Sequence, residues 1–398
     1  MRQAAFALAL LLGLQPVTTD LYLPALPALT RSLGASMSAA QQTMAALLLA
    51  FGIGQLMWGP VSDRIGRRPV LLIGLTLYTA AGFGAAMASH IGWLIGWRTL
   101  QGLGLAASVV CARALVRDLY EPVRGAQVMA YGMSGLGLLA VLSPSVGGLV
   151  AGIGGWRLAL ATVGAVGAVA LACVMRWLPE THRRRGRAAA SPRALARAWL
   201  DILRHRDFIA WSLLMASTFG GLFTMLAASS FVFIDVLGVA PALYGVAIGS
   251  ASAAYIGGTF VCRHWIRHHG LAGAVRRGAW FTLAGGLVMV VPVLLGMASA
   301  WTLVVAQCLY GLGHGIHQPC GQAGAVGPFP ERAGVAAALS GFGMAATAFG
   351  VGVWLGASFD RSPGPMAQGV AFWSLMTTVV AWTLVQRLAP PRPAAAHR

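Results

Sequence analysis

The recurrence of long apolar runs along the whole chain constrains its fold more than any other feature of the sequence. Each run is about 20 residues long, which is enough for an α-helix to cross a hydrocarbon layer of roughly 30 Å. Helices satisfy their own backbone hydrogen bonds in lipid, whereas membrane β-barrels use shorter, alternating segments. Hydrophobic residues make up 58% of the chain and charged residues only 10%, too few to cover the surface of a soluble protein. The sequence therefore predicts an all-α membrane protein.

Helix-breaking glycines and prolines divide the apolar sequence into twelve predicted transmembrane helices. The predicted spans are 4–26, 41–61, 70–89, 91–114, 125–152, 156–178, 208–234, 241–262, 275–298, 300–324, 334–357 and 367–388. We read the first as a retained helix rather than a signal peptide, because no small-residue cleavage site follows it.

One long polar stretch, 179–207, separates six predicted spans from six. It predicts an N-terminal six-helix bundle over 1–178, a cytoplasmic linker over 179–207 and a C-terminal six-helix bundle over 208–398. Within the linker, Leu195, Trp199 and either Ile202 or Leu203 are spaced to form an amphipathic helix along the membrane surface. The stretch can connect the two bundles, act as a topology signal, or do both.

The distribution of basic residues predicts the orientation of the chain. All 28 are arginine and the net charge is +18, a balance that can indicate nucleic-acid binding. Here, however, the arginines gather in alternate short loops and in the run Arg183, Arg184 and Arg185, while the opposite loops hold only Arg31, Arg157 and Arg361. The positive-inside rule then places both termini and the linker in the cytoplasm. We expect a multi-pass protein of a bacterial inner membrane and no nucleic-acid partner.

The two predicted bundles resemble each other weakly in sequence. The segment from Arg98 to Gly104 in the fourth span parallels the segment from Gln307 to Gly313 in the tenth. Duplicated six-helix halves are a transporter architecture in which the binding site lies between the halves. The repeat supports that architecture, although chains rich in glycine and leucine also produce chance matches.

The predicted turn between the second and third spans combines one acid with three arginines and two glycines. Its residues are Gly59, Asp63, Arg64, Gly66, Arg67 and Arg68. Glycine permits a tight reversal, and Asp63 can accept hydrogen bonds from arginines or from an exposed helix N-terminus. A plain positive-inside loop would explain the arginines but not the acid and glycines at this spacing. We predict a conformational latch that holds the cytoplasmic ends of two helix groups together.

With this turn the chain resembles the major facilitator superfamily of transporters, and three further segments extend the resemblance. The fourth-helix motif of that family is matched by Arg98, Gln101, Gly102 and Gly104, and the fifth-helix antiporter motif is approached by Pro144, Gly147 and Gly148, with Ser143 in place of its first glycine. The segment from Asp20 to Pro27 is similar to the first-helix signature of the Bcr/CflA drug-resistance branch. The resemblance implies two pseudo-symmetric six-helix bundles in the major facilitator fold and a drug:proton antiporter.

Two charges, Asp20 and Arg98, fall within apolar spans, and the predicted orientation places both in the outer part of the membrane. Ionisable groups at such depth are costly and tend to be functional or paired. Our hypothesis is proton coupling: Arg98 holds Asp20 ionised in one state and releases it for protonation in another, because losing a nearby positive charge raises the proton affinity of a carboxylate. A static ion pair, or Asp20 capping the helix end near Pro24, would explain the same charges.

Polar and aromatic residues within the spans are candidates for a substrate cavity, since apolar walls with few polar groups suit varied small ligands. The candidates are Thr19, Tyr22, Gln55, Phe231, His314, His317 and Gln318. His314 and His317 are three residues apart and are expected to share a helix face. They can line the cavity, bond to a neighbouring helix or relay protons. Ordinary packing is the alternative for each candidate, and no metal site is predicted.

Motifs of other function classes are missing from the sequence. It contains no GxxxxGK[ST] nucleotide loop and no HExxH or GxSxG hydrolase motif. We therefore expect no enzyme and no cofactor, with the proton gradient as the energy source. The predicted function is proton-coupled efflux of drugs or small amphiphilic compounds by alternating access. The alternative is a same-fold exporter or importer of a specific metabolite. The expected partners are a small-molecule substrate, protons and the lipid bilayer, with the monomer as the functional unit.

Overall fold

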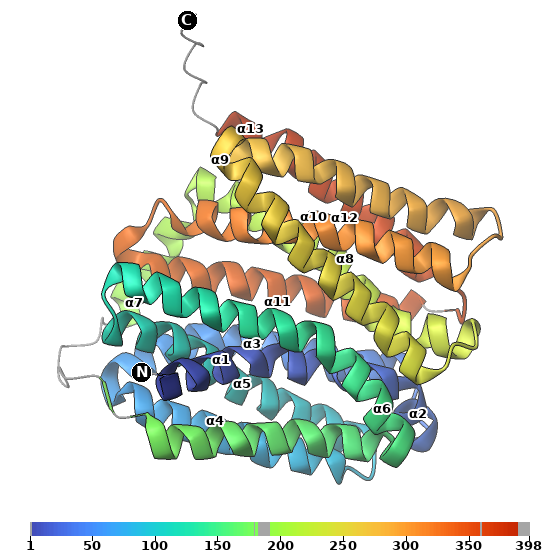
Figure 1. Ribbon diagram of the computed structural model, residues 1–398, viewed down its shortest axis with the longest axis horizontal. Helices are drawn as coiled ribbons and strands as arrows, with labels where there is room; N and C mark the ends of the chain where they lie inside the picture. Colours follow the sequence, from blue (N-terminus) through green and yellow to red (C-terminus); the bar gives the residue numbers. More distant parts are fainter. Residues whose placement is uncertain (1, 179, 182–191, 359, 389–398) are drawn as a thin grey trace, which may run out of the picture.

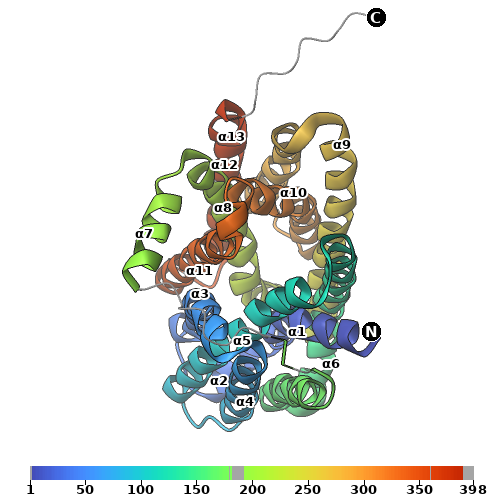
Figure 2. The ribbon, with the colours of Figure 1, turned by 90° about the vertical axis from the view of Figure 1, so that its left-hand side faces the viewer.

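The computed structural model describes residues 2–178, 180–181, 192–358 and 360–388, and nearly all of these residues are helical. No strand occurs among them, so the predicted all-α class is confirmed. Figure 1 shows the long helices lying side by side across the view, and Figure 2 looks along them from one end. The predicted arginine run at 183–185 lies outside the described residues.

The first half of the chain forms seven helical elements. They are α1 (Arg2–Asp20), the 3-10 turn η1 (Leu23–Ala25), α2 (Leu26–Ser32), α3 (Met37–Ile65), α4 (Arg67–Ala86), α5 (Ile91–Leu119) and α6 (Pro122–Trp177). The predicted span 4–26 is therefore broken after Asp20, where Pro24 and Pro27 lack the N–H groups that a continuous helix needs. The chain then continues in α2, which moves the end of the first membrane crossing to Ser32.

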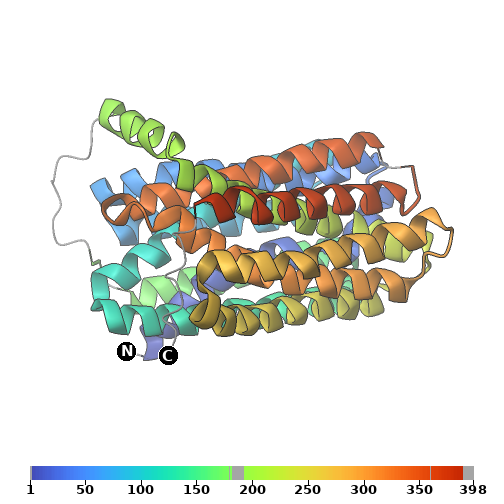
Figure 3. The ribbon, with the colours of Figure 1, turned by 90° about the horizontal axis from the view of Figure 1, so that it is seen from above.

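The second half begins with the amphipathic helix α7 (Pro192–Leu203), which the sequence predicted. Its Ile202 is buried and its Trp199 packs against the same apolar cluster, which includes Phe208 and Trp211, so the apolar face of α7 lies against the second half of the protein. The remaining elements are α8 (Arg206–Ser230), the π-helical turn η2 (Phe231–Val236), α9 (Pro241–Leu294), α10 (Ala300–Val326), η3 (Pro330–Arg332), α11 (Ala333–Ser358), α12 (Gly364–Trp382) and α13 (Leu384–Arg387). In Figure 3, α7 stands off from the long helices at the same end as the start of α1.

Nine stretches of the described residues are long and apolar enough to cross a membrane. Two of them, in α6 and α9, each contain a hairpin reversal at Gly155 and Gly270, whose φ values of 67° favour glycine. The 27-residue helix α10 is a further crossing of suitable length, although it contains Gln307, His314 and Gln318. The helices therefore supply the twelve predicted crossings.

Small residues let corresponding helices of the two halves approach closely, as the weak sequence repeat indicated. A Cβ on Gly102 would lie 2.1 Å from the carbonyl oxygen of Leu47 on α3, and one on Gly104 would lie 2.5 Å from that of Gly74 on α4. In the second half, Gly311 and Gly313 likewise bring α10 close to the backbone of α9, before and after the reversal at Gly270. Such contacts are typical of membrane helix packing, in which small residues line the interfaces. Figure 2 shows α1–α6 below and α8–α13 above.

Candidate transport site

A cavity of about 300 Å³ lies between the two halves, within the size range of small-molecule sites. Helices α1, α3, α5 and α6 of the first half line it together with α8, α9, α10 and α11 of the second. Its walls are mostly apolar and include Phe51, Phe223 and Met344. The cavity extends toward one end of the bundle, where it reaches Gln322 in the last turns of α10.

The halves meet at the opposite end, where α3 begins. Arg31 of α2 forms an ion pair with Asp235 of η2, with Nη1 and Oδ1 2.6 Å apart, and Gln41 of α3 donates a hydrogen bond to the carbonyl of Ala227 on α8. On α11, Gly356 lies so close to Ser38 that an added Cβ would come within 2.7 Å of its hydroxyl. The cavity is therefore closed at the end that holds Ser36 and extends toward the end that holds the loop between α3 and α4.

Asp20 ends α1 at the cavity wall, where its residue is 9% exposed. Its carboxylate accepts a hydrogen bond from the hydroxyl of Thr19, with 2.6 Å between Oγ1 and Oδ1. The helix breaks here because Pro24 follows, which leaves this carboxylate beside the interrupted backbone. Thr19 also lines the cavity, so the structure brings together these two residues that the sequence singled out.

The predicted ion pair between Arg98 and Asp20 does not form in this structure. Arg98 is fully buried and donates instead to the carbonyl of Thr18 at 2.9 Å and to Oε1 of Gln101 at 2.7 Å. Its guanidinium also stacks on the ring of Tyr22, 4.2 Å from the centroid. Opposite charges at similar depth did not fix a contact, because α1 turns a backbone carbonyl rather than the carboxylate toward α5. Arg98 thus contacts α1 two residues before Asp20.

Three of the predicted cavity residues lie elsewhere. Tyr22 is buried beneath Arg98 and exchanges a hydrogen bond with the hydroxyl of Thr43. Phe231 is buried at the start of the π-helical turn that follows α8 and does not line the cavity. His317 faces α9, where its ring nitrogens lie 3.4 Å from the hydroxyl of Thr282 and 3.3 Å from the carbonyl of Val275. The cause is the rotation of each helix about its axis. A helix that is apolar on every face gives no sequence signal for which face turns toward the cavity.

His314 and Gln318 do line the cavity, as does Gln55 on α3. His314 and Gln318 belong to a stripe on α10 that repeats with helical spacing and also includes Gln307, Gly311 and Gln322. His314 Nδ1 lies 3.1 Å from the hydroxyl of Thr218 on α8. His317 lies near His314 but does not line the cavity with it, and Gln318, four residues on, takes that position.

Arg113 is a cavity residue that the sequence reasoning missed. It lies on α5 near the end of the predicted span 91–114, where a long arginine side chain commonly reaches the membrane surface. In the structure it lines the cavity and is exposed there. In the predicted span 91–114 it stands one residue before the end, and the one available signal is that it shares a helix with Arg98.

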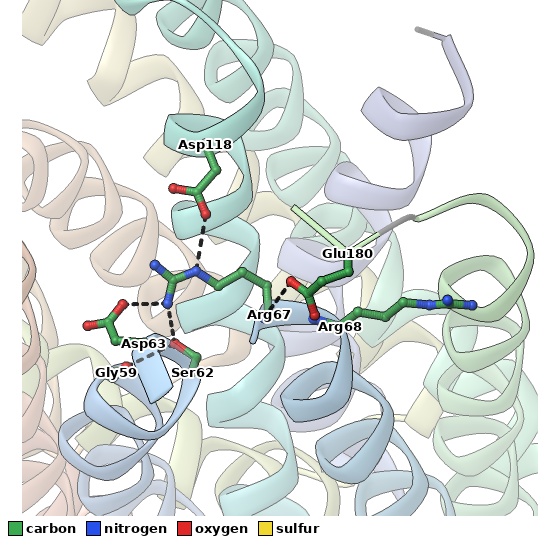
Figure 4. A network of polar contacts seen from close by, with 7 residues as sticks. All are labelled: Gly59, Ser62, Asp63, Arg67, Arg68, Asp118 and Glu180. Atoms are coloured by element: carbon green, nitrogen blue, oxygen red, sulfur yellow. Dashed lines mark hydrogen bonds and ion pairs between the residues drawn. The ribbon is translucent and has the colours of Figure 1, made fainter. Parts of the chain in front are cut away.

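The loop between α3 and α4 forms a polar network, drawn in Figure 4. Arg67 bonds through Nη1 to Asp63 at 2.6 Å and to Ser62 at 2.6 Å, and through Nε to Asp118 of α5 at 3.1 Å. The carboxylate of Glu180, after α6, accepts from the backbone N–H groups of Arg67 and Arg68. Gly66 is required here, because its φ is 106° and a Cβ would lie 2.4 Å from Glu180.

Each of these bonds joins elements of the first half, so the network ties α3, α4, α5 and the end of α6 together. The side chain of Asp63 remains 56% exposed on the side where the cavity extends. Gly59 contributes its carbonyl, which accepts from the hydroxyl of Ser62, while Arg64 follows Asp63 on the exposed last turn of α3.

The antiporter-like segment lies where α6 meets both α1 and α9. A Cβ on Gly147 would lie 1.8 Å from the carbonyl oxygen of Leu21, within the first half. One on Gly148 would lie 2.6 Å from the carbonyl oxygen of Pro241 on α9, across the halves. The carbonyl oxygen of Pro144 would lie 2.5 Å from a Cβ added to Gly245 of α9. This segment is therefore part of the closed end of the interface.

Comparisons with known proteins agree with this architecture. The family model of the Major Facilitator Superfamily matches residues 8–352. Multidrug resistance protein D of Escherichia coli K12 is 31% identical over 84% of this chain and 83% of its own length. A bicyclomycin resistance protein homolog of Haemophilus influenzae is 25% identical over 89% of both chains.

A solved structure of the xylose transporter of E. coli, described as a partially occluded inward-open conformation, superposes with a TM-score of 0.76. It covers 98% of this chain and 97% of its own at 15% identity, which shows the shared fold. The twelve crossings, the cavity between two halves and these relatives together make the chain a membrane transporter rather than an enzyme. It belongs to the Major Facilitator Superfamily, and its relatives there include multidrug and bicyclomycin resistance proteins.

Proposed function

We propose that the protein exports drugs or other small amphiphilic compounds from the bacterial cytoplasm in exchange for protons. The observation that supports this most directly is the position of Asp20. Among the described residues that line the cavity, it is the one carboxylate, and it stands at the end of the cavity nearest the closed side. A partly enclosed carboxylate beside a cargo cavity is suited to bind and release the exchanged proton.

Alternating access requires that the two halves close one end of the cavity at a time. The charge distribution of the loops places the closed end, at Ser36, on the periplasmic side and the α3–α4 loop in the cytoplasm. The conformation described here is then inward-facing, and cargo enters from the cytoplasm. Protonation of Asp20 from the periplasm favours one orientation and cargo binding the other, each through its differential affinity for the two states.

Arg98 has a positioning role in this mechanism. Its charge is held by a carbonyl and an amide oxygen rather than by a carboxylate, and its contact with Thr18 fixes the last turn of α1 before Asp20. The α3–α4 network would act as the latch: when the cytoplasmic ends of the halves approach, the half-exposed Asp63 is available to an N-terminus of the second half.

The deciding experiment uses purified protein in proteoliposomes with an imposed pH gradient and a panel of labelled drugs that includes bicyclomycin. We expect drug movement against its gradient in exchange for protons, its collapse with an uncoupler, and its loss in Asp20→Asn. Asp360→Asn, which changes an exposed carboxylate in the loop after α11, is the matched control and should transport normally. Unchanged exchange by Asp20→Asn would refute the coupling role. Drug movement in the same direction as protons would indicate an importer.

A further inference from the structure

We propose that Arg113 binds the cargo, and that the preferred cargo is an amphiphile whose polar end is an anion or another strong hydrogen-bond acceptor, such as a carboxylate. This proposal rests on the proposed function only in taking the central cavity as the cargo site. It goes further by assigning a specificity-determining residue and a chemical class of ligand.

The first observation is a charge without a protein partner. Arg113 lines the cavity from α5, and no ion pair or hydrogen bond to its side chain occurs among the described residues. The other arginines that point into the protein differ, since Arg67 bonds to two carboxylates and Arg98 to two oxygen acceptors. A guanidinium offers five N–H donors in a planar fork that matches carboxylates and similar groups.

The location of Arg113 argues against a surface role. Helix α5 continues six residues beyond it to Leu119, which places Arg113 about 9 Å inside the helix end at the usual rise per residue. A side chain that merely served topology would extend along the outside of the bundle to the headgroups. Arg113 instead shares the cavity with Gln55 of α3 and Gln318 of α10.

The second observation is a set of amide groups in the same cavity whose hydrogen-bonding capacity is unused. Gln307 is 1% exposed, lines the cavity, and neither its Oε1 nor its Nε2 has a partner in the protein. The Oε1 of Gln318 is likewise buried without a partner. Buried polar groups are normally satisfied, so these amides are suited to a ligand. Gln318 lies eight residues before the end of α10, at a depth similar to that of Arg113 on α5, whereas Gln307 lies 11 residues, about 16 Å, nearer the closed end.

The charge balance of the cavity then selects the ligand class. Asp20 and Arg113 are the charged residues of the lining, and they lie far apart along the crossing direction. Arg98, which contacts α1 two residues before Asp20, is 15 residues from Arg113 on α5, about 22 Å at the usual rise. When Asp20 takes up a proton, the cavity keeps a net positive charge, which attracts an anion or acceptor and repels an organic cation. The aromatic and methionine walls accommodate an apolar body of varied shape.

The test is an equilibrium binding measurement with two probes of the same apolar body and opposite charge, 1-naphthoate and 1-naphthylmethylamine. Radiolabelled probes are dialysed against the full-length protein in uncharged detergent near neutral pH, with no gradient. We expect wild type to bind naphthoate more tightly than the amine. Arg113→Gln should weaken naphthoate binding about tenfold or more, the usual cost of losing a charge-assisted hydrogen bond, and leave the amine equal or tighter.

Two further variants keep the result interpretable. Arg113→Lys retains the charge and should keep most of the naphthoate preference, and Arg197→Gln on the exposed face of α7 should bind as wild type does. Wild type without a preference for naphthoate, or naphthoate binding unchanged in Arg113→Gln, would overturn the proposal. Displacement of naphthoate by added phosphatidylglycerol would overturn it in favour of a lipid ligand. Because no proton gradient is present, failure of the coupling role of Asp20 would leave this outcome unaffected.

Discussion

At the residue scale, Arg98 is an arginine buried without a carboxylate partner, which is costly in a membrane and calls for a functional explanation. Replacing a buried polar pair by apolar residues of similar volume is often neutral or stabilising. We therefore expect the double variant Arg98→Met, Gln101→Met to unfold at the same temperature as wild type or higher. Its drug transport should fall by about tenfold or more, since the contact that positions Thr18 is lost.

The control for that experiment is Gln307→Met, which changes the residue of α10 that parallels Arg98 in the weak repeat and whose amide forms no hydrogen bond with the protein. It should raise stability slightly and leave proton coupling intact, even if drug binding weakens. Thermal unfolding followed by size-exclusion, with transport measured on the same preparations, checks both variants. A large loss of stability in the double variant with transport preserved would mean that Arg98 serves packing alone.

Sequence reasoning at this scale identified the residue types of the site but not all of its members. Asp20, Thr19, Gln55, His314 and Gln318 were found because polar side chains stand out within apolar spans. The others were misplaced because a membrane helix is apolar on every face, so its sequence does not show which face turns toward the cavity. Rotation of α10 decides between His317 and Gln318, and only the packed structure supplies it.

At the element scale, adjacent glycines on α6 separate two kinds of packing. Gly147 contacts α1 within one half, whereas Gly148 contacts α9 of the other half. Gly147→Ala should lower the unfolding temperature clearly, because overpacking commonly costs ~1–3 kcal/mol. Gly148→Ala should change that temperature less and instead separate the halves at the closed end. Its effect is measured as faster thiol labelling of a cysteine placed at Ser38.

Gly152→Ala is the control for this pair, since no atom lies within 4 Å of a Cβ added one turn further along the same helix. It should behave as wild type in both measurements. Equal effects of Gly147→Ala and Gly148→Ala on stability and labelling would contradict the assignment of the two glycines to different interfaces.

The elements themselves were largely predictable from the sequence. Apolar runs, prolines and glycines located every crossing, and Ser299 with Thr302 forms a capping box at the start of α10. A helix end at Asp20 entered only as an alternative, in which Asp20 caps the helix near Pro24, and the π-helical end of α8 was not predicted. Both are local changes of hydrogen bonding within apolar sequence, and hydropathy carries no signal for them.

At the scale of the whole molecule, the orientation of the cavity depends on weak contacts between the halves. The Arg31–Asp235 ion pair joins them at the closed end, and both side chains are substantially exposed, at 64% and 37%. An exposed ion pair contributes only about 0–1 kcal/mol, so it adds little to folding stability. The same free energy changes the ratio of two conformations by up to about fivefold. The architecture can be predicted from the sequence. The ratio of the two conformations cannot, because it depends on a small free-energy difference between two packed states.

We therefore expect Arg31→Asp, which places two acids together, to shift the protein away from the inward-facing state. Labelling of a cysteine at Ser38 should become about fivefold faster, with no change in unfolding temperature. The charge swap Arg31→Asp with Asp235→Arg should return labelling toward the wild-type rate, and high salt should reduce the difference because exposed charges are screened. If the swap labels as fast as the single variant, the pair does not hold the periplasmic end closed, and the apolar contacts of α3 with α11 and of α6 with α9 must do so alone.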